Sequence, residues 1–312
     1  MEDDPLVTLC VSFYNLGRYL PDALASLAGQ TYRNLEVLVI NDGSTDDASA
    51  RVFETQQQLY PQFRFVSQAN AGPCATRNRG IAEAKGDFFI PMDADNIATP
   101  QMVERFVAGI RARPDVSALT CYYLAFKETA DIAQMDFCYT FRPTGGSFVL
   151  GSLENIYGDT NSIYRIADLR AVGGFNTDRD TGHQDWELFV KLVSARFQVA
   201  VLPEYLFYYR HREDSLVRTT NSYRNRQRVL RQYFRAERLP EVEQMALWTA
   251  LHSLHVRLAQ YHCRQSSDRY RIADEVADFL EKFPHLSRLM WGLFLLGWRM
   301  WKRARSMLRR GH

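Results

Sequence analysis

The sequence predicts an α/β protein built on a doubly wound, mostly parallel, Rossmann-like sheet with a helical extension at its C-terminal end. Short apolar runs alternate with segments of helical periodicity through residues 1–100, which is the pattern of a parallel sheet with right-handed crossovers. Beyond residue 215 the pattern becomes amphipathic and helical. We therefore expect an α/β domain over 1–215, in halves 1–100 and 101–215, and a helical region over 216–312.

The first half should contain four strands and three helices in alternation. Strands are expected at 6–13, 35–40, 63–67 and 88–90, and helices at 19–27, 46–58 and 74–84. The first strand is a continuous apolar run, which indicates a central parallel strand covered on both faces. Pro91 and Asn96 are expected to mark where the fourth strand ends and a loop begins.

The second half is expected to be less regular. A helix is predicted at 101–113 and a strand at 116–126, followed by a looser, aromatic-rich stretch at 135–150. Apolar residues at helical spacing predict another helix that begins near Asp185. Long amphipathic patterns predict further helices at 222–237, 241–263 and 268–283.

Composition excludes several classes of protein. With 46% hydrophobic and 24% charged residues, the chain has an ordinary globular composition. Five cysteines are scattered without a Cys-x-x-Cys pair, which argues against a zinc site or a disulfide framework and favours the reducing cytoplasm. The acidic start of the chain lacks an apolar core, so we expect no secretory signal. No run reaches the roughly 18 apolar residues of a spanning helix.

Two carboxylates one residue apart follow the apolar run at 88–90. Side chains alternate along extended backbone, so Asp93 and Asp95 can project to the same side at the carboxyl end of a strand. Open α/β sheets bind ligands at that edge. A hard divalent cation prefers such oxygen ligands and completes its shell with water and substrate phosphates. The alternative is a solvated turn that contains two aspartates.

Polar groups also follow the other strands of the first half, at Tyr14 and Asn15, at Asp42 and at 70–72. Because the carboxyl ends of parallel strands share one edge of the sheet, these groups should converge on one crevice. Four strands that end in this way are better explained by a nucleotide pocket than by isolated turns. A dinucleotide site and a P-loop are disfavoured, since neither glycine-rich motif occurs.

Seven short motifs occur in a fixed order between residues 11 and 211. They are Val-Ser-Phe-Tyr-Asn (11–15), Val-Ile-Asn-Asp-Gly-Ser-Thr-Asp (39–46), Asn-Ala-Gly-Pro-Cys-Ala-Thr-Arg-Asn-Arg-Gly (70–80), Met-Asp-Ala-Asp (92–95), Val-Gly-Gly-Phe-Asn (172–176), Gln-Asp-Trp-Glu-Leu (184–188) and Tyr-Arg-His (209–211). With these motifs the chain resembles the family 2 inverting glycosyltransferases of the GT-A fold. The resemblance extends to about residue 215, or two thirds of the chain.

The resemblance implies a nucleotide site made by Tyr14, Asn15, Asp42, Arg77 and Asp93. Tyr14 would lie against the base and Asp42 would bond its edge, because an aromatic face and one acceptor suffice to read a flat heterocycle with an N–H. Asp93 would contact the ribose. Arg77 would lie near the diphosphate or the base, the alternative being a surface arginine on the helix at 74–84.

The resemblance also implies a metal site and a sugar site. Asp95 would hold a Mn²⁺ or Mg²⁺ ion that bridges both phosphates. His211 would join Asp95 on the metal or bond a phosphate oxygen, although its segment is one residue shorter than in the family. Residues 158–165 resemble the donor-sugar region. The donor sugar and the acceptor would therefore meet Asn161, Ser162 and Trp186.

Asp185 lies in the first turn of its predicted helix, and it has two interpretations. It caps a structural helix, or it is a catalytic base that the unpaired N–H groups of the helix N-terminus keep ionised. The nucleotide motifs upstream favour the base. Gln184 stands where the family has glutamate and cannot supply that charge. Glu187 is the backup base, about 200° away around the helix, and His183 is expected to be a packed or surface residue.

These features predict a metal-dependent inverting glycosyltransferase that moves a sugar from a nucleoside-diphosphate donor to a hydroxyl of a glycan or glycolipid. The resemblance favours a UDP-sugar and a role in bacterial surface polysaccharide synthesis. The alternatives are a non-catalytic nucleotide-sugar-binding module and a nucleotidyltransferase. No nucleic-acid partner is expected. The predicted location is the cytoplasm, with peripheral attachment to the inner face of the cytoplasmic membrane.

The end of the chain carries a net basic charge that the rest of the chain does not. Eight lysines and arginines follow Glu281 without any acidic residue, so residues 1–281 carry 30 basic and 36 acidic side chains. An apolar segment with tryptophans lies among these basic residues and is too short to span a bilayer. One interpretation is a helix in 285–312 that lies on an anionic membrane surface. The other is a helix packed on the catalytic domain or on a second subunit.

Overall fold

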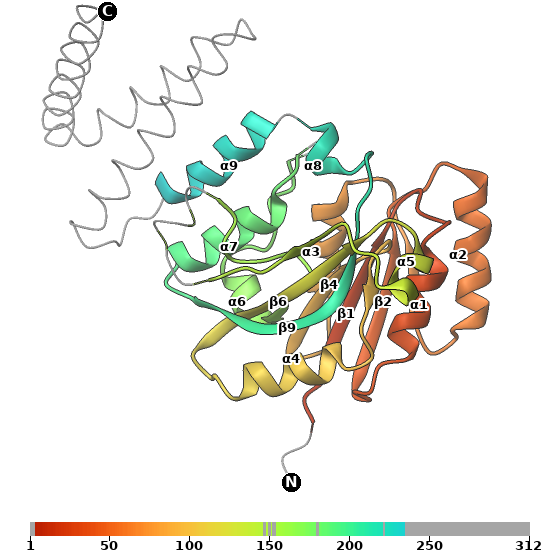
Figure 1. Ribbon diagram of the computed structural model, residues 1–312, viewed down its shortest axis with the longest axis horizontal. Helices are drawn as coiled ribbons and strands as arrows, with labels where there is room; N and C mark the ends of the chain where they lie inside the picture. The colour runs from red at the N-terminus through yellow and green to blue at the C-terminus, as the bar shows by residue number, and fades with distance from the viewer. Residues whose placement is uncertain are drawn as a thin grey trace, which may run out of the picture. The chain divides into compact units, whose positions relative to one another are not determined.

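A computed structural model describes residues 4–145, 148, 151, 154–178, 181–220 and 222–234 (Figure 1). The strands are β1 (Val7–Phe13), β2 (Leu35–Asn41), β3 (Arg64–Ser67), β4 (Phe88–Asp93), β5 (Ile97–Ala98), β6 (Val116–Phe126), β7 (Tyr139–Phe141), β8 (Ile163–Arg165) and β9 (Gln198–Arg210). The helices are α1 (Leu20–Ala28), α2 (Asp47–Leu59), α3 (Pro73–Glu83), α4 (Met102–Arg111), α5 (Thr129–Gln134), α6 (Ile166–Ala171), α7 (Gln184–Ser194), α8 (Leu216–Thr219) and α9 (Ser222–Phe234). One compact unit spans Met1–Ala236.

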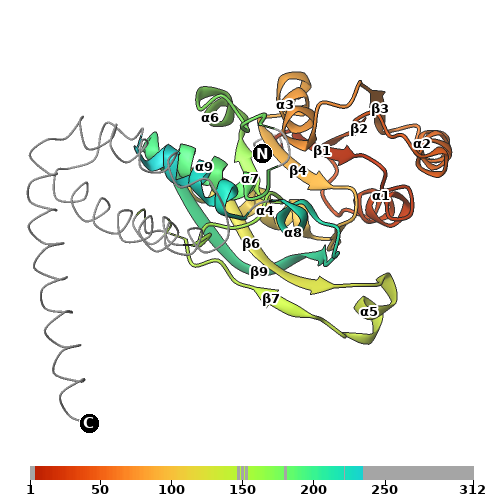
Figure 2. The ribbon, with the colours of Figure 1, turned by 90° about the horizontal axis from the view of Figure 1, so that it is seen from above.

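The strands form one sheet in the order β3-β2-β1-β4-β8-β6-β9-β5, with β7 paired to β6. In the first half, β1 pairs in parallel with β2 and β4, and β2 pairs in parallel with β3. Helix α3 lies on one face of this half and α1 lies on the other (Figure 2). The doubly wound α/β fold predicted from the alternating pattern is therefore confirmed. Every residue of β1 is buried, as a central strand requires.

Strand β4 runs through Pro91 instead of ending before it. Pro91 pairs with Cys10 of β1, and the strand continues to Asp93. The predicted strand end at Pro91 is therefore wrong. On its other side β4 pairs with β8 only at Phe88 and Phe89, so that edge needs no further N–H donors where proline stands. The longer strand brings Asp93 to the end of the sheet.

The second half of the sheet is mixed. The two longest strands, β6 and β9, pair in parallel, while β8 is antiparallel to both β4 and β6 and so joins the halves. Strand β7 and helix α5 form a short excursion from the end of β6, which the sequence did not predict as separate elements. Helix α5 has only six residues and ends at Met135 in the left-handed conformation. Such a short helix has too few residues for a periodic pattern.

Helices α7 and α9 pack against each other beside the second half of the sheet (Figure 1). The predicted helix at 222–237 corresponds to α9. The helices predicted at 241–263 and 268–283, and the segment 285–312, lie outside the described residues. Among the residues that are described, no helix is both long and apolar enough to cross a bilayer.

Candidate active site

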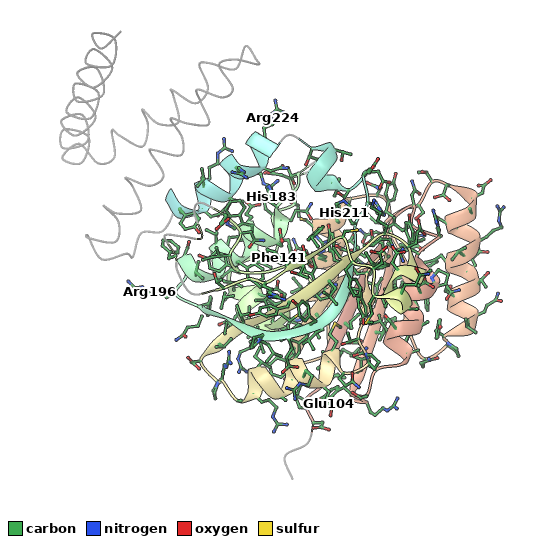
Figure 3. All side chains as sticks on the ribbon, in the orientation of Figure 1. Glu104, Phe141, His183, Arg196, His211 and Arg224 are labelled. Atoms are coloured by element: carbon green, nitrogen blue, oxygen red, sulfur yellow. The ribbon has the colours of Figure 1, made fainter. Side chains whose placement is uncertain are left out.

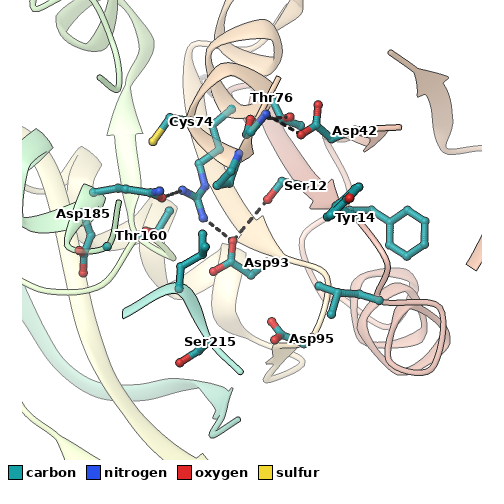
Figure 4. A pocket seen from close by; sticks show the side chains of 18 of the residues that line it. Ser12, Tyr14, Asp42, Cys74, Thr76, Asp93, Asp95, Thr160, Asp185 and Ser215 are labelled. Atoms are coloured by element: carbon teal, nitrogen blue, oxygen red, sulfur yellow. Dashed lines mark hydrogen bonds and ion pairs between the residues drawn. The ribbon is translucent and has the colours of Figure 1, made fainter. Parts of the chain in front are cut away.

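A pocket of about 650 Å³ lies at the carboxyl ends of β1, β2 and β4 (Figure 4). Its lining includes Tyr14, Asn15, Asp42, Arg77, Asp93, Asp95 and Asp185. The polar groups that follow separate strands in the sequence therefore meet in one pocket, as parallel strands require. Figure 4 shows Asp93 between Asp185 on one side and Tyr14 and Asp42 on the other.

Arg77 is the central cation of this pocket. Its Nη2 donates to Asp93 Oδ1 at 2.5 Å, and its Nη1 donates to Gln184 Oε1 at 2.7 Å. The guanidinium also lies over the ring of Phe175, and only 4% of the residue is exposed. The alternative of a surface arginine is therefore excluded. Gln184, which lacks the charge of the family's glutamate, instead serves as a neutral acceptor for Arg77.

Asp42 shapes the loop that leads into α3. Its Oδ1 accepts from the Ala71 N–H at 2.9 Å and from Gln68 Nε2 at 2.7 Å, and its Oδ2 accepts from the Gly72 N–H at 2.8 Å. Gly72 has φ of 90°, a conformation that glycine adopts without the strain of a side chain. This loop positions α3 and therefore Arg77. Most of the hydrogen-bonding capacity of the Asp42 carboxylate is already used by the protein.

The side chain of Tyr14 is accessible to a ligand, whereas that of Asn15 is largely occupied by hydrogen bonds within the protein. Tyr14 is 41% exposed and lines the pocket. Asn15 adopts φ of 51°, and its Oδ1 accepts from the Thr45 N–H at 2.8 Å while its Nδ2 donates to the Thr45 hydroxyl at 3.0 Å. Tyr14 is thus the accessible aromatic face, and Asn15 mainly ties its loop to the start of α2.

The carboxylate of Asp95 pairs with an arginine. Arg212 Nη1 lies 3.0 Å from Asp95 Oδ2, and both side chains are mostly buried. Burial raises the pKa of Asp95 to about 6, and the nearby charge of Asp93 adds to this effect. Two carboxylates that repel one another in a pocket are a donor set that fits a divalent cation completed by substrate oxygens. No cluster of three or more potential metal-binding side chains occurs in the described part of the chain.

His211, labelled in Figure 3, is not among the residues that line the pocket, in contrast to the predicted metal-binding role. Its ring packs edge-on against Tyr139, with the two centroids 5.5 Å apart. Strand β9 ends at Arg210, and the neighbours on either side, Arg210 and Arg212, both line the pocket. Because side chains alternate along extended backbone, His211 points to the other side. Arg212 takes the place beside Asp95 that we predicted for the histidine.

Asp185 occupies the second position of α7 and is not its cap. The cap residue is His183, which has φ of 57° and makes no side-chain capping bond. Asp185 lines the pocket, and its Oδ2 accepts from Asn155 Nδ2 at 3.1 Å. Burial raises the pKa of Asp185, although the charge of His183 and the helix N–H groups oppose this shift. Burial therefore has a larger effect on the pKa of Asp185 than the N–H groups of the helix N-terminus have.

Glu187, the predicted backup base, faces away from the pocket. It is 1% exposed, and its Oε2 accepts from Arg228 Nε of α9 at 3.0 Å. Its Oε1 accepts from Gln232 Nε2 at 2.9 Å. An acceptor molecule in the pocket cannot reach a carboxylate that is paired on the opposite side of α7, so the backup role does not fit.

The residues predicted to bind the sugar do not line the pocket, but residues one or two positions away in the sequence do. Asn161 and Ser162 are completely buried, and Trp186 is buried with its Nε1 donating to the Gly151 carbonyl at 2.7 Å. None of the three lines the pocket, whereas Asp159 and Thr160 do. Burial, together with the charge of Asp185, raises the pKa of Asp159 well above its ordinary value. Asp159 and Thr160 are therefore the residues of the predicted donor-sugar segment, 158–165, whose polar groups line the pocket.

Comparison with protein families matches residues 8–173 to the family described as "Glycosyl transferase family 2". An uncharacterized glycosyltransferase of Haemophilus influenzae is 36% identical over 123 residues, or 39% of this chain. That match covers 38% of the relative, so the chain spans well under half of its length.

Comparison with solved structures gives similar folds at low sequence identity. S. aureus TarS 1–349 in complex with UDP-GlcNAc has a TM-score of 0.67 at 17% identity, covering 88% of this chain and 81% of that one. The mannosyltransferase PcManGT from Pyrobaculum calidifontis, in complex with GDP-Man and Mn²⁺, has a TM-score of 0.58 at 18% identity, covering 92% and 83%. These similarities show a GT-A fold for the α/β unit.

Proposed function

The chain belongs to glycosyltransferase family 2, and we propose on this basis that it transfers a sugar, with inversion, from a nucleoside-diphosphate donor to a hydroxyl of a glycan or glycolipid. One observation carries the proposal. The buried Arg77 donates hydrogen bonds to both Asp93 and Gln184. Asp93 lies on the side of the pocket that contains Tyr14 and Asp42, and Gln184 directly precedes Asp185. The residues proposed to bind the nucleotide and the carboxylate proposed as the base thus line the same pocket, which supports the proposal.

In the proposed reaction Asp185 acts as the general base. Its carboxylate accepts the proton of the acceptor hydroxyl as that oxygen bonds to the anomeric carbon of the donor sugar. The bond from this carbon to the diphosphate oxygen breaks on the opposite face, and the nucleoside diphosphate leaves with the electron pair. A single displacement inverts the configuration of the anomeric carbon. The raised pKa of Asp185 makes its carboxylate a stronger proton acceptor than an ordinary aspartate.

The diphosphate would lie among Asp93, Asp95, Arg77 and Arg212. Asp93 and Asp95 would hold a Mn²⁺ or Mg²⁺ ion, and a bound divalent ion neutralises the charge that develops on a leaving diphosphate. Arg212 is a second source of positive charge in this region, because it already pairs with Asp95. Its guanidinium can bond phosphate oxygens with two N–H groups at once.

Uridine is the proposed base and a UDP-hexose the proposed donor. The TarS structure that resembles this fold contains UDP-GlcNAc, which supports a uridine donor, although a second neighbour contains GDP-Man. Tyr14 is the exposed aromatic face on which the base would stack. The proposed role is synthesis of a bacterial surface polysaccharide.

A panel of nucleotide sugars with Mn²⁺ tests this function. We expect slow release of nucleoside diphosphate from one donor and faster release when the matching acceptor is present. Binding of the donor without turnover with any acceptor would instead support a sugar-binding module. Release of pyrophosphate from a nucleoside triphosphate would support a nucleotidyltransferase.

Replacement of Asp95 tests the proposed metal site. Asp95→Asn should abolish Mn²⁺-dependent turnover of the donor and leave the protein folded, because the amide keeps the shape of the side chain but not its charge. Mn²⁺ should raise the melting temperature of the wild type, since a ligand that binds only the folded state stabilises it, and should raise that of the variant much less. Near-normal activity of Asp95→Asn with Mn²⁺ would move the metal site elsewhere.

We further propose that residues 285–312, which lie outside the described part of the chain, attach the enzyme to an anionic membrane surface. Each basic residue near such a surface contributes about 1 kcal/mol to the free energy of membrane binding, and salt weakens this contribution. The full chain should float with anionic vesicles at low salt, whereas a chain ending at residue 284 should stay behind and keep its activity on a soluble acceptor. A full chain that never floats would contradict the proposal.

A further inference from the structure

Helix α9 bonds to the helix that carries the proposed base. Glu187 of α7 accepts from Arg228 Nε at 3.0 Å, and Arg228 Nη2 bonds the same carboxylate oxygen. Gln232, one turn further along α9, donates to the other oxygen of Glu187 at 2.9 Å. The exposed fractions of the Arg228 and Glu187 side chains are 8% and 1%, so this is a buried ion pair.

The same helix also holds the loop that precedes α7. The Gly182 N–H donates to Asn225 Oδ1 of α9 at 2.9 Å, and Asn176 Nδ2 donates to Glu187 Oε1 at 3.0 Å. The described parts of this loop, residues 176–178 and 181–183, contribute Asp178 and His183 to the lining of the pocket. Asn225 of α9 therefore holds the end of the loop at Gly182 directly, whereas Glu187 of α7, which pairs with Arg228 of α9, holds the other end at Asn176.

The arrangement of α7 connects these contacts to the pocket. Glu187 lies two residues after Asp185, which is about 200° around the helix. Asp185 therefore faces the pocket while Glu187 faces α9, and a rotation or shift of α7 would move both. A buried ion pair adds little to the free energy of unfolding, because the cost of desolvating both charges opposes their attraction. Its main effect here is on the position of α7 relative to α9.

We propose that Glu187, Arg228 and Asn225 form a clamp through which α9 fixes residues 181–183 and the first turn of α7, and thereby sets the position of Asp185. The three are positioning residues and do not touch the substrate. The inference rests on the proposed function only in taking Asp185 as the base.

The first test separates positioning from folding. Glu187→Gln combined with Arg228→Met removes both charges of the ion pair but keeps an amide oxygen that can accept from Gln232 and Asn176, so neither an unpaired buried charge nor an unpaired donor is left to lower stability. We expect a melting temperature close to that of the wild type, a kcat lowered about 10-fold or more, and a donor KM within about 3-fold. Arg231→Met, at an exposed position of the same helix, is the matched control and should keep the wild-type kcat. A double variant with wild-type kcat would overturn the clamp.

The second test needs no substrate. Asn225→Ala removes the acceptor of the Gly182 N–H, so hydrogen exchange at the Gly182 amide should become faster. Asn225→Asp keeps an acceptor oxygen at this position and should restore both the slow exchange and the kcat. Unchanged exchange in Asn225→Ala would overturn the clamp. Because exchange is measured without a donor, failure of the clamp and failure of the proposed transfer activity give different results.

Discussion

Asp185→Asn should lower the transfer rate by roughly two to four orders of magnitude, the usual loss when a general base is removed. The amide has nearly the same shape and keeps an oxygen that can accept from Asn155, but it cannot take a proton at neutral pH. Affinity for the nucleoside diphosphate should stay within a few-fold of the wild type. Transfer rates under saturating donor and acceptor, with diphosphate titration as the binding control, measure both quantities. An active Asp185→Asn variant would exclude Asp185 as the base.

The stability of this variant has a predictable sign. Burial raises the pKa of Asp185 above that of an ordinary aspartate, so the folded state binds the proton more tightly than the unfolded chain. Stability therefore decreases as pH rises from the ordinary value, about 3.9, through the raised one. At neutral pH the charge is a net cost, and Asp185→Asn should melt at the same temperature as the wild type or higher.

The acid side of the rate profile should reflect the same shift. The base must be ionised, so kcat of the wild type should fall as pH drops through the raised pKa, at a higher pH than for an exposed aspartate. The charged groups that act on Asp185 include His183 and Arg77, which oppose the shift, and Asp159, whose carboxylate repels that of Asp185. Measurement of kcat from pH 4 to 9 at constant ionic strength tests this. A rate that stays constant down to pH 4 would contradict it.

The strands and helices of the first half were predictable because their local patterns and their tertiary environment agree. The runs at 6–13 and 35–40 are buried in the sheet as their continuous apolar character indicates. The predicted strand end at Pro91 was wrong because proline is usually found outside the interior of a strand. That β4 has no pairing partner beside Pro91 on one side could not be read from the sequence. Helix α5 and strand β7 were missed because elements of six and three residues carry no clear period.

Residues at the ends of strands were placed well, and residues in less regular segments were not. The positions of Asp42 and Asp93 follow directly from the parallel sheet. The exchange of His211 for Arg212 is an error of one residue, which reverses the side on which a side chain lies in extended backbone. The one-residue shortage of the segment relative to the family was the signal that pointed to it.

The partners of Glu187 could not be predicted, because they lie about 40 positions away on α9. An amphipathic pattern predicts which face of a helix is buried, but not which polar side chain of another helix will meet it. The long-range contact that joins the two halves, between Arg77 and Gln184, was missed for the same reason. Both contacts connect α7 to other elements, so the environment of the proposed base is the part of the site that the sequence described least.

Arg77→Met should have the second large effect, because this side chain joins the two sides of the pocket. Methionine fills a similar volume but loses the bonds to Asp93 and Gln184. Removing one partner of a buried ion pair lowers the free energy of unfolding by about 3–5 kcal/mol. We expect a decrease near the lower end of this range, because the Asp93 side chain is 31% exposed. We expect kcat/KM for the donor to fall by roughly two orders of magnitude, as misplaced reacting groups cause.

The matched control for this variant is Arg79→Met on the same helix. Arg79 pairs with Glu83 at 2.7 Å, but its side chain is 32% exposed, and surface pairs of this kind contribute about 0–1 kcal/mol. Its loss should leave kcat/KM within about 3-fold of the wild type. Arg77→Lys should fall between the two, because an ammonium keeps the charge but not the planar fork that reaches both partners. An Arg77→Met variant with wild-type kcat/KM and diphosphate affinity would show that the bridge between Asp93 and Gln184 is structural, and would leave Asp95 and Arg212 as the groups that bind the diphosphate.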